Sequence, residues 1–193
     1  MSKILIISAS PRVNGNSDIL AEQFKKGAEE AGNKVETIHL RNLNYGFCKG
    51  CLACQKTGKC VLKDDIADVF PKIMEADKIV LASPVYYYSL SGQMKTFLDR
   101  CNPLYGRMKG KTFYFILTMT DKDKSNMERV FDAFEGFTMC FDDITPGGRV
   151  YGAASDAKGA VVDTPAYKDA YMLGKEVMDH GKPDVIRASH EDY

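Results

Sequence analysis

Hydrophobic residues along the chain alternate between two patterns. Short, nearly continuous apolar runs are typical of buried parallel strands, and they occur at Lys3–Ile7, Val35–Leu40, Lys78–Ala82, Thr112–Thr118 and, more weakly, Val150–Ala154. Between these runs, apolar residues recur every three or four positions, which is typical of helices packed on one face. The helical segments are Ser17–Ala31, a segment that begins at Asp64 and Asp65, Gly92–Cys101, Asn126–Thr138 and Ala166–Met178.

This alternation predicts an α/β fold built on a doubly wound, five-stranded parallel sheet with the strand order 2-1-3-4-5. No linker, repeat or low-complexity block divides the chain. We therefore expect one domain over residues 1–180 and a polar C-terminal tail over residues 181–193. In such a sheet, ligands bind beyond the carboxyl ends of the strands, near the switch in strand order. Candidate chemistry should lie in the loops after the first, third and fourth strands.

Composition excludes some classes of function. The chain has 193 residues, of which 45% are hydrophobic and 27% charged, as in an ordinary soluble domain. Its 26 basic and 26 acidic residues balance, and no basic stripe is present, so we expect no nucleic-acid partner. No segment approaches the length of a membrane span, and the N-terminus does not resemble a secretory signal. We therefore expect a cytoplasmic protein that does not associate with membranes.

The loop after the first strand has the features of a phosphate-binding loop. Ser8–Ser17 is rich in small hydroxyl and amide residues and leads into a helix N-terminus, where backbone N–H groups and the helix dipole favour an anion. Arg12 can add a bidentate contact to phosphate. The loop lacks the G-x-G-x-x-G and Gly-Lys-Ser/Thr motifs, which favours a mononucleotide. The alternative is an ordinary loop in which Asn16 or Ser17 caps the helix.

The loop after the third strand is aromatic. Three consecutive tyrosines begin at Tyr86, shortly after Pro84, and they cannot all face a core. Aromatic faces and backbone amides beside a proline suit a flat heterocycle. The alternatives are an exposed aromatic loop and a surface used for dimerisation.

Four of the six cysteines crowd into one stretch with the spacing C-x2-C-x2-C-x5-C: Cys48, Cys51, Cys54 and Cys60. In a cytosolic chain of this size, such crowding indicates metal or redox chemistry rather than a disulfide scaffold. In bacterial ferredoxins, C-x2-C-x2-C supplies three ligands to one [4Fe–4S] cluster, and Cys60 could supply the fourth. The alternatives are a zinc site, free thiols, a redox-active disulfide and simple loop packing.

Three other residues near helix ends have simpler interpretations. Cys101 lies on an apolar helix face and should be in the core, and Cys140 should be a packed thiol. Arg100, next to Asp99, either pairs with a neighbouring subunit or belongs to a solvated helix end.

Several of these motifs together resemble a known family. The sequence S-x-S-P-R followed by N-x-N-S, then S-P-V-Y and G-x-x-K-x-F-x-D-R, resembles the NAD(P)H-dependent FMN reductase group of the flavodoxin-like superfamily. The segment C-K-G-C-L-A-C, which ends at G-K-C-V-L-K-D-D, resembles the iron–sulfur flavoproteins of anaerobes within that group. The resemblance covers most of residues 1–105, and beyond them it rests on the strand–helix rhythm.

The resemblance implies a flavodoxin-like fold and FMN as cofactor. It places the phosphate on Ser10, Arg12, Asn16 and Ser17. It places the isoalloxazine against Pro84, Val85, Tyr86 and Tyr87. It also implies a homodimer or homotetramer whose interface completes the flavin site. The expected donor is NADH or NADPH, or reduced ferredoxin where a cluster is present, and no residue is expected to act as a catalytic acid or base.

Three functional hypotheses follow from the sequence. The first is an FMN-dependent oxidoreductase that passes electrons between FMN and a [4Fe–4S] cluster on the Cys48–Cys60 loop. The second is a cluster-free NAD(P)H reductase that acts on flavins, quinones or nitroaromatics. The third is a non-catalytic flavin- or zinc-binding protein in which the cysteine loop is structural.

Overall fold

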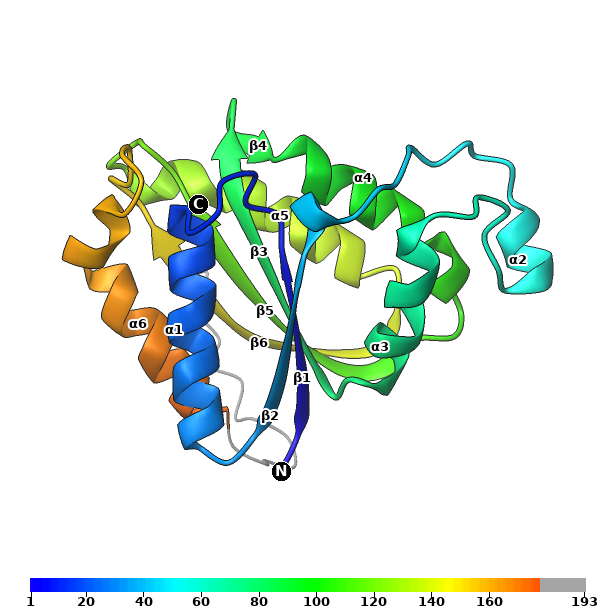
Figure 1. Ribbon diagram of the computed structural model, residues 1–193, viewed down its shortest axis with the longest axis horizontal. Helices are drawn as coiled ribbons and strands as arrows, with labels where there is room; N and C mark the ends of the chain where they lie inside the picture. Colours follow the sequence, from blue (N-terminus) through cyan, green and yellow to red (C-terminus); the bar gives the residue numbers. More distant parts are fainter. Residues whose placement is uncertain (178–193) are drawn as a thin grey trace, which may run out of the picture.

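A parallel sheet runs through the middle of the computed structural model, which describes residues 1–177 (Figure 1). In these residues, five parallel strands have the order β2-β1-β3-β5-β6, and a short strand, β4, pairs antiparallel with the end of β3. The strands are β1 (Lys3–Ser8), β2 (Lys34–His39), β3 (Lys78–Tyr86), β4 (Ser89–Leu90), β5 (Lys109–Thr118) and β6 (Asp142–Gly152). Counted over the parallel strands alone, the order is the predicted 2-1-3-4-5.

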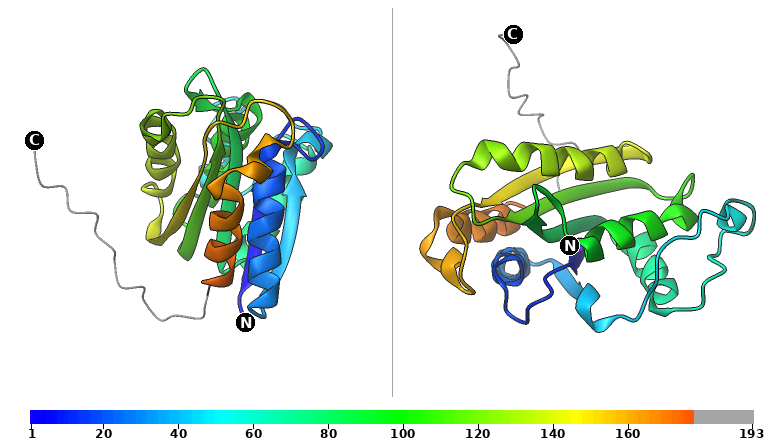
Figure 2. Two further views of the ribbon diagram at one scale, coloured as in Figure 1. Left: turned by 90° about the vertical axis from the view of Figure 1, so that its left-hand side faces the viewer. Right: turned by 90° about the horizontal axis from the view of Figure 1, so that it is seen from above.

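Helices cover both faces of the sheet, as expected for a doubly wound fold (Figure 2). One face carries α1 (Asn16–Glu30) and α6 (Pro165–Lys175), and the other carries α3 (Val69–Glu75), α4 (Gly92–Arg100) and α5 (Glu128–Thr138). One further helix, α2 (Ala53–Thr57), lies within the cysteine-rich stretch. None of the helices in residues 1–177 has the length and apolar character needed to cross a lipid bilayer.

Alternating side chains on each strand divide the core into two halves. On β1, Ile4 and Ile6 face α1 and α6, whereas Leu5 and Ile7 face α3, α4 and α5. All four are at most 2% exposed, because both faces of β1 are covered. The continuous apolar run that predicted this strand therefore reflects burial on two sides.

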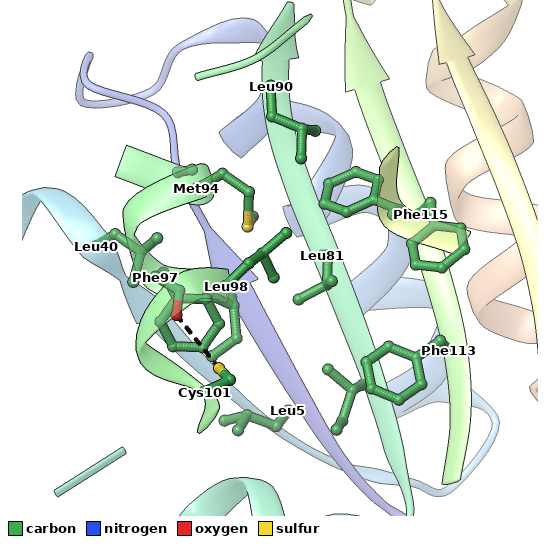
Figure 3. Packing of buried hydrophobic residues seen from close by; sticks show 14 of the residues in the cluster. Leu5, Leu40, Leu81, Leu90, Met94, Phe97, Leu98, Cys101, Phe113 and Phe115 are labelled. Carbon is green, nitrogen blue, oxygen red and sulfur yellow. Dashed lines mark hydrogen bonds between the residues drawn. The ribbon is translucent and has the colours of Figure 1, made fainter. Parts of the chain in front are cut away.

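Cys101 belongs to this core, as predicted. Its thiol lies among apolar side chains of α4 and the sheet and donates to the carbonyl oxygen of Phe97 at 3.3 Å (Figure 3). Burial raises the pKa of the Cys101 thiol, which stays protonated at neutral pH. The prediction for Cys140 was wrong, because this thiol is exposed just beyond the end of α5.

The last strand is much longer than its hydrophobic pattern indicated. Val150–Ala154 was predicted, but β6 covers Asp142–Gly152. Its first half contains Pro146, Gly147 and Gly148, which have low strand propensity but are tolerated on an edge strand. The β5–β6 register shifts at Tyr114, and a Cβ on Gly147 would overlap the Tyr114 ring. The predicted tail over residues 181–193 and the predicted helix end at Met178 lie outside the described residues.

Two glycines allow α1 and α6 to pack closely. A Cβ on Gly27 would overlap the carbonyl oxygen of Tyr171, and a Cβ on Gly174 would overlap that of Phe24. The neighbouring atoms are backbone, so they cannot move away as a flexible side chain could. Helix–helix contact on this face therefore requires glycine at both positions.

Gly27→Ala should lower the free energy of unfolding by about 1–3 kcal/mol, because overpacking outweighs the gain of about 1 kcal/mol in helix propensity. Gly136→Ala is the matched control, because Gly136 lies in α5 with open space where its Cβ would be. The control should be neutral or stabilising by up to about 1 kcal/mol. Urea denaturation of both variants checks this, and equal stabilisation of both would contradict close packing at Gly27.

Candidate functional site

A hollow of about 120 Å³ opens at the carboxyl ends of β1, β3 and β5, where the strand order switches. Its lining comes from four loops that are far apart in sequence: Ser10, Pro11, Arg12, Gly15, Asn16 and Ser17, then Pro84, Val85 and Tyr86, then Thr118, Met119 and Thr120, and finally Ser155 and Asp156. Seven of the eight residues predicted to contact the cofactor line this one hollow. The eighth, Tyr87, does not.

The loop between β1 and α1 presents an uncapped helix N-terminus to the hollow. The N-cap residue is Gly15, and it makes no side-chain cap hydrogen bond. Asn16 and Ser17 are the first helical residues, so the suggestion that one of them caps α1 was wrong. The Oγ of Ser10 and the backbone N–H of Gly15 both donate to the Arg12 carbonyl, at 2.7 and 3.1 Å, which draws the loop into a tight turn. An anion is the natural partner of such an N-terminus.

The side chains of Asn16 and Ser17 are engaged with other loops. Asn16 Nδ2 donates to the carbonyl oxygens of Ser155 and Ala157, at 3.0 and 2.9 Å, and its Oδ1 accepts from the Gly159 N–H at 2.9 Å. The Ser17 and Thr118 hydroxyls lie 3.0 Å apart. These bonds tie the loops after β5 and β6 to the start of α1. Towards the hollow, Asn16 and Ser17 therefore offer mainly backbone N–H groups.

The three tyrosines point in different directions. β3 continues through Tyr86 and returns as β4 through a two-residue turn, in which Tyr87 and Tyr88 have φ values of 50° and 54°. Such type I′ turns favour glycine or asparagine, so two tyrosines here are strained. Tyr87 is completely exposed at the tip. Tyr88 turns towards the loop after β5, where its hydroxyl donates to Asp121 Oδ2 at 3.3 Å.

A second, larger hollow of about 400 Å³ lies at the other end of α4. All four clustered cysteines line it, together with Arg100 and Asn102. The structure corrects the expectation for Arg100, because its side chain is fully buried. It donates to both carboxylate oxygens of Asp64, at 2.6 and 2.8 Å, and to the carbonyl oxygen of Gly46 at 2.8 Å. This bidentate pair closes the base of the cysteine-rich segment, residues 46–64, and holds the pKa of Asp64 below its usual range.

Comparison with known proteins establishes the family. Residues 2–139 match the family model described as NADPH-dependent FMN reductase. The chain belongs to this family.

Curated relatives of this FMN reductase family member include an iron–sulfur flavoprotein from Archaeoglobus fulgidus. It is 39% identical over 112 residues, which are 56% of this chain and 50% of the relative. An iron–sulfur flavoprotein from Methanocaldococcus jannaschii is also 39% identical, over 53% of each chain. The chain thus spans about half the length of the curated relatives it matches. A solved NAD(P)H:quinone oxidoreductase from Methanothermobacter marburgensis shares the fold with a TM-score of 0.69 at 15% identity, covering 94% of this chain and 98% of that one.

The cysteine-rich segment has the donor set that an iron–sulfur cluster needs. Three of the four sulfurs already receive N–H groups: Cys54 Sγ from Asn102 Nδ2 at 3.0 Å, and Cys60 and Cys48 from Arg100 Nη2 and the Gly50 N–H, both at 3.5 Å. Arg100 also has a buried Nε with no acceptor. Within residues 1–177, no three Cys, His, Asp or Glu side chains are already arranged to hold a metal ion. The four cysteines and the N–H donors to three of their sulfurs are compatible with a cluster in their chemistry, and the thiols would have to turn towards one another to hold it.

Some lining residues were missed by sequence reasoning. Thr118 could have been found, because it ends the predicted fourth strand and therefore lies at the edge of the sheet where ligands bind. Ser155 and Asp156 carried no such signal, because they follow the strand whose pattern was weakest. Only the fold brings them beside Asn16.

Asp64→Asn should lower the free energy of unfolding by about 1.5–3 kcal/mol at pH 7, because the buried Arg100 loses charged hydrogen bonds to its counter-ion. Because the pKa of Asp64 is lowered in the folded state, the ionised carboxylate stabilises the fold above about pH 4. This stabilisation is lost as the pH falls through the folded-state pKa. The difference from wild type should therefore shrink at pH 3 in urea denaturation. Asp99→Asn, which breaks an exposed pair with Lys95, is the control and should cost less than about 0.5 kcal/mol. An equal penalty for Asp64→Asn at both pH values would contradict the charge argument.

Proposed function

We propose that this chain binds FMN and works as an FMN-dependent oxidoreductase. The observation that carries the proposal is the single hollow where the phosphate-type loop and the aromatic loop meet. In the proposed site, the phosphate lies against Ser10, Arg12 and the backbone N–H groups of Asn16 and Ser17. Family membership supports the choice of FMN.

The isoalloxazine is assigned to the rim formed by Pro84, Val85 and Tyr86. A volume of about 120 Å³ is well below the roughly 300–1,000 Å³ typical of small-molecule sites, so the ring would extend beyond the hollow. A second copy of the chain would then cover it, in line with the homodimer or homotetramer expected from the sequence. Tyr87, which is fully exposed and does not line the hollow, could contact the ring only from this outer side.

FMN, when bound, supplies the redox chemistry, because it can accept a hydride and release electrons singly or in pairs. The chain's own residues bind and orient it. We propose NADH or NADPH as the donor in the cytoplasm, and a small molecule such as a flavin, a quinone or a nitroaromatic compound as the acceptor. Bound flavin that no donor can reduce would instead favour a non-catalytic flavin protein.

Purified protein should be yellow and carry FMN rather than FAD, as judged by chromatography of the extracted flavin. Arg12→Ala should weaken FMN binding by about 1.5–3 kcal/mol, the contribution of a charged hydrogen bond. Fluorescence titration of flavin-free protein measures this loss. Arg107→Ala is the control, because Arg107 is an exposed arginine beside Gly58 and away from the hollow. The proposed site would be contradicted if the extracted flavin were FAD or if no flavin bound after reconstitution. Equal effects of Arg12→Ala and Arg107→Ala on FMN binding would also contradict it.

We propose in addition that Cys48, Cys51, Cys54 and Cys60 bind one [4Fe–4S] cluster, which would let reduced ferredoxin serve as a donor. The shared hollow and the N–H groups directed at three sulfurs support this assignment. Hydrogen bonds to the sulfurs are among the features that set cluster potentials. Two 39%-identical relatives are named iron–sulfur flavoproteins.

Anaerobic reconstitution with iron and sulfide should add about four iron and four sulfide per chain, broad absorbance beyond the flavin bands and an EPR signal on reduction. Cys51→Ser should lose most of this iron, whereas Cys140→Ser should not, because Cys140 lies beyond α5, outside the cysteine-rich segment. The cluster would be contradicted by any of three results: zinc bound without sulfide, a disulfide among these cysteines, or iron uptake that Cys51→Ser leaves unchanged. Each result would leave a cluster-free reductase.

A further inference from the structure

A buried carboxylate, that of Asp18, directly follows Ser17, which lines the proposed phosphate site. Asp18 is the third residue of α1, and its side chain is only 4% exposed. Its Oδ1 accepts from the Ser8 hydroxyl at 2.5 Å, and its Oδ2 accepts from Arg41 Nη1 at 2.7 Å. His39 Nδ1 lies 3.4 Å from the same Oδ1. A carboxylate in the first turn interacts favourably with the helix dipole, but it would repel an anion bound at the same end of the helix.

Ser8 and Arg41, two of the three groups around Asp18, also hold the backbone of Ser10. Ser8 Oγ accepts from the Ser10 N–H at 3.4 Å, and Arg41 Nη1 donates to the Ser10 carbonyl oxygen at 3.3 Å. Both contacts are long, but they act on the same residue from two sides. Ser10 in turn donates to the Arg12 carbonyl. The chain of contacts therefore runs from Asp18, through Ser8 and Arg41, to the segment that carries Arg12.

Arg41 also balances the charge of Asp18. Its side chain is 13% exposed, and it comes from the short 3-10 turn Leu40–Asn42 that directly follows β2. Parallel pairing of β1 with β2 sets Ser8 opposite His39. Arg41 follows His39 by two residues and therefore lies beside the start of α1. Without Arg41, the carboxylate would remain buried close to the proposed phosphate.

We propose that Arg41 is a positioning residue for flavin phosphate. It holds the Ser10–Arg12 segment in its binding conformation and neutralises Asp18, although it does not line the hollow itself. This inference rests on the proposed FMN site and deepens it. It makes two separate claims, one about conformation and one about charge, and different variants test them.

The first test compares FMN with riboflavin, which lacks the phosphate. Arg41→Gln should weaken FMN binding by roughly 10- to 100-fold, while riboflavin binding should change by less than about threefold. Arg41→Lys keeps the charge without the guanidinium fork and should show an intermediate loss. Arg149→Gln is the matched control, because Arg149 also bridges carboxylates, those of Glu128 and Glu135, but lies outside the hollow. Flavin fluorescence titrations give the dissociation constants, and thermal unfolding checks that each variant is folded.

The second test separates charge from general damage to the loop. Asp18→Asn removes the buried charge but leaves one acceptor oxygen where Ser8 and Arg41 use two, so on its own it also loosens Arg41. The charge claim is therefore tested where Arg41 is already replaced. The double variant Arg41→Gln with Asp18→Asn should recover at least part of the affinity that Arg41→Gln loses. A simple structural role for this cluster predicts the opposite, with the double variant weaker than Arg41→Gln alone.

The outcomes also separate this inference from the proposed function. Wild-type protein that binds neither flavin, or that binds riboflavin as tightly as FMN, would overturn the proposed phosphate site itself. If wild type prefers FMN but Arg41→Gln loses affinity for FMN and riboflavin equally, only the positioning role of Arg41 would be overturned. Unchanged FMN affinity in both Arg41 variants would do the same. No recovery in the double variant would overturn the claim about charge.

Discussion

Hydrogen bonding of β1 to two parallel neighbours is the constraint on which the rest of the molecule depends. β1 pairs with β2 on one side and with β3 on the other, and its central residues are buried on both faces. The chain can leave β1 towards β2 only by crossing over one face, and it reaches β3 by crossing over the other. This reversal leaves a gap at the carboxyl ends of the strands, and the loops that line the 120 Å³ hollow all meet there.

Helix α4 connects this gap with the cysteine-rich segment. Its first residue, Gly92, follows the β3–β4 hairpin, and Ser91 caps it by accepting from the Met94 N–H. Its last residue, Arg100, is buried against Asp64 at the base of the cysteine-rich segment. The apolar face between these ends packs on the sheet (Figure 3). The cysteine-lined hollow thus lies at the C-terminal end of α4, and the N-terminal end of α4 follows the hairpin whose Tyr86 lines the other hollow.

The sequence was sufficient for the fold and for the convergence of the predicted loops at one hollow, because the strands that place these loops have clear local patterns. Buried strands show as apolar runs, and the doubly wound order then determines which loops converge. The edge strand β6 was underestimated, because an edge strand need not be apolar throughout and can contain Pro146 and two glycines. The direction of each tyrosine was also beyond reach. The tyrosine directions follow from the left-handed conformation of Tyr87 and Tyr88. The turn contains no glycine or asparagine, so its sequence does not predict this conformation.

The role of arginine was the hardest part to predict, for a physical reason. A buried arginine needs a carboxylate partner, and its partner here is remote in sequence, as with Arg41 and Asp18 or Arg100 and Asp64. A chain with zero formal net charge shows no sign of such pairs in its composition. In both pairs, the carboxylate fixes the guanidinium while another N–H reaches the candidate site, at the Ser10 carbonyl in one case and the Cys60 sulfur in the other. Each pair is close to neutral overall, so it can orient a donor towards the Ser10 carbonyl or the Cys60 sulfur without leaving an uncompensated buried charge in the apoprotein.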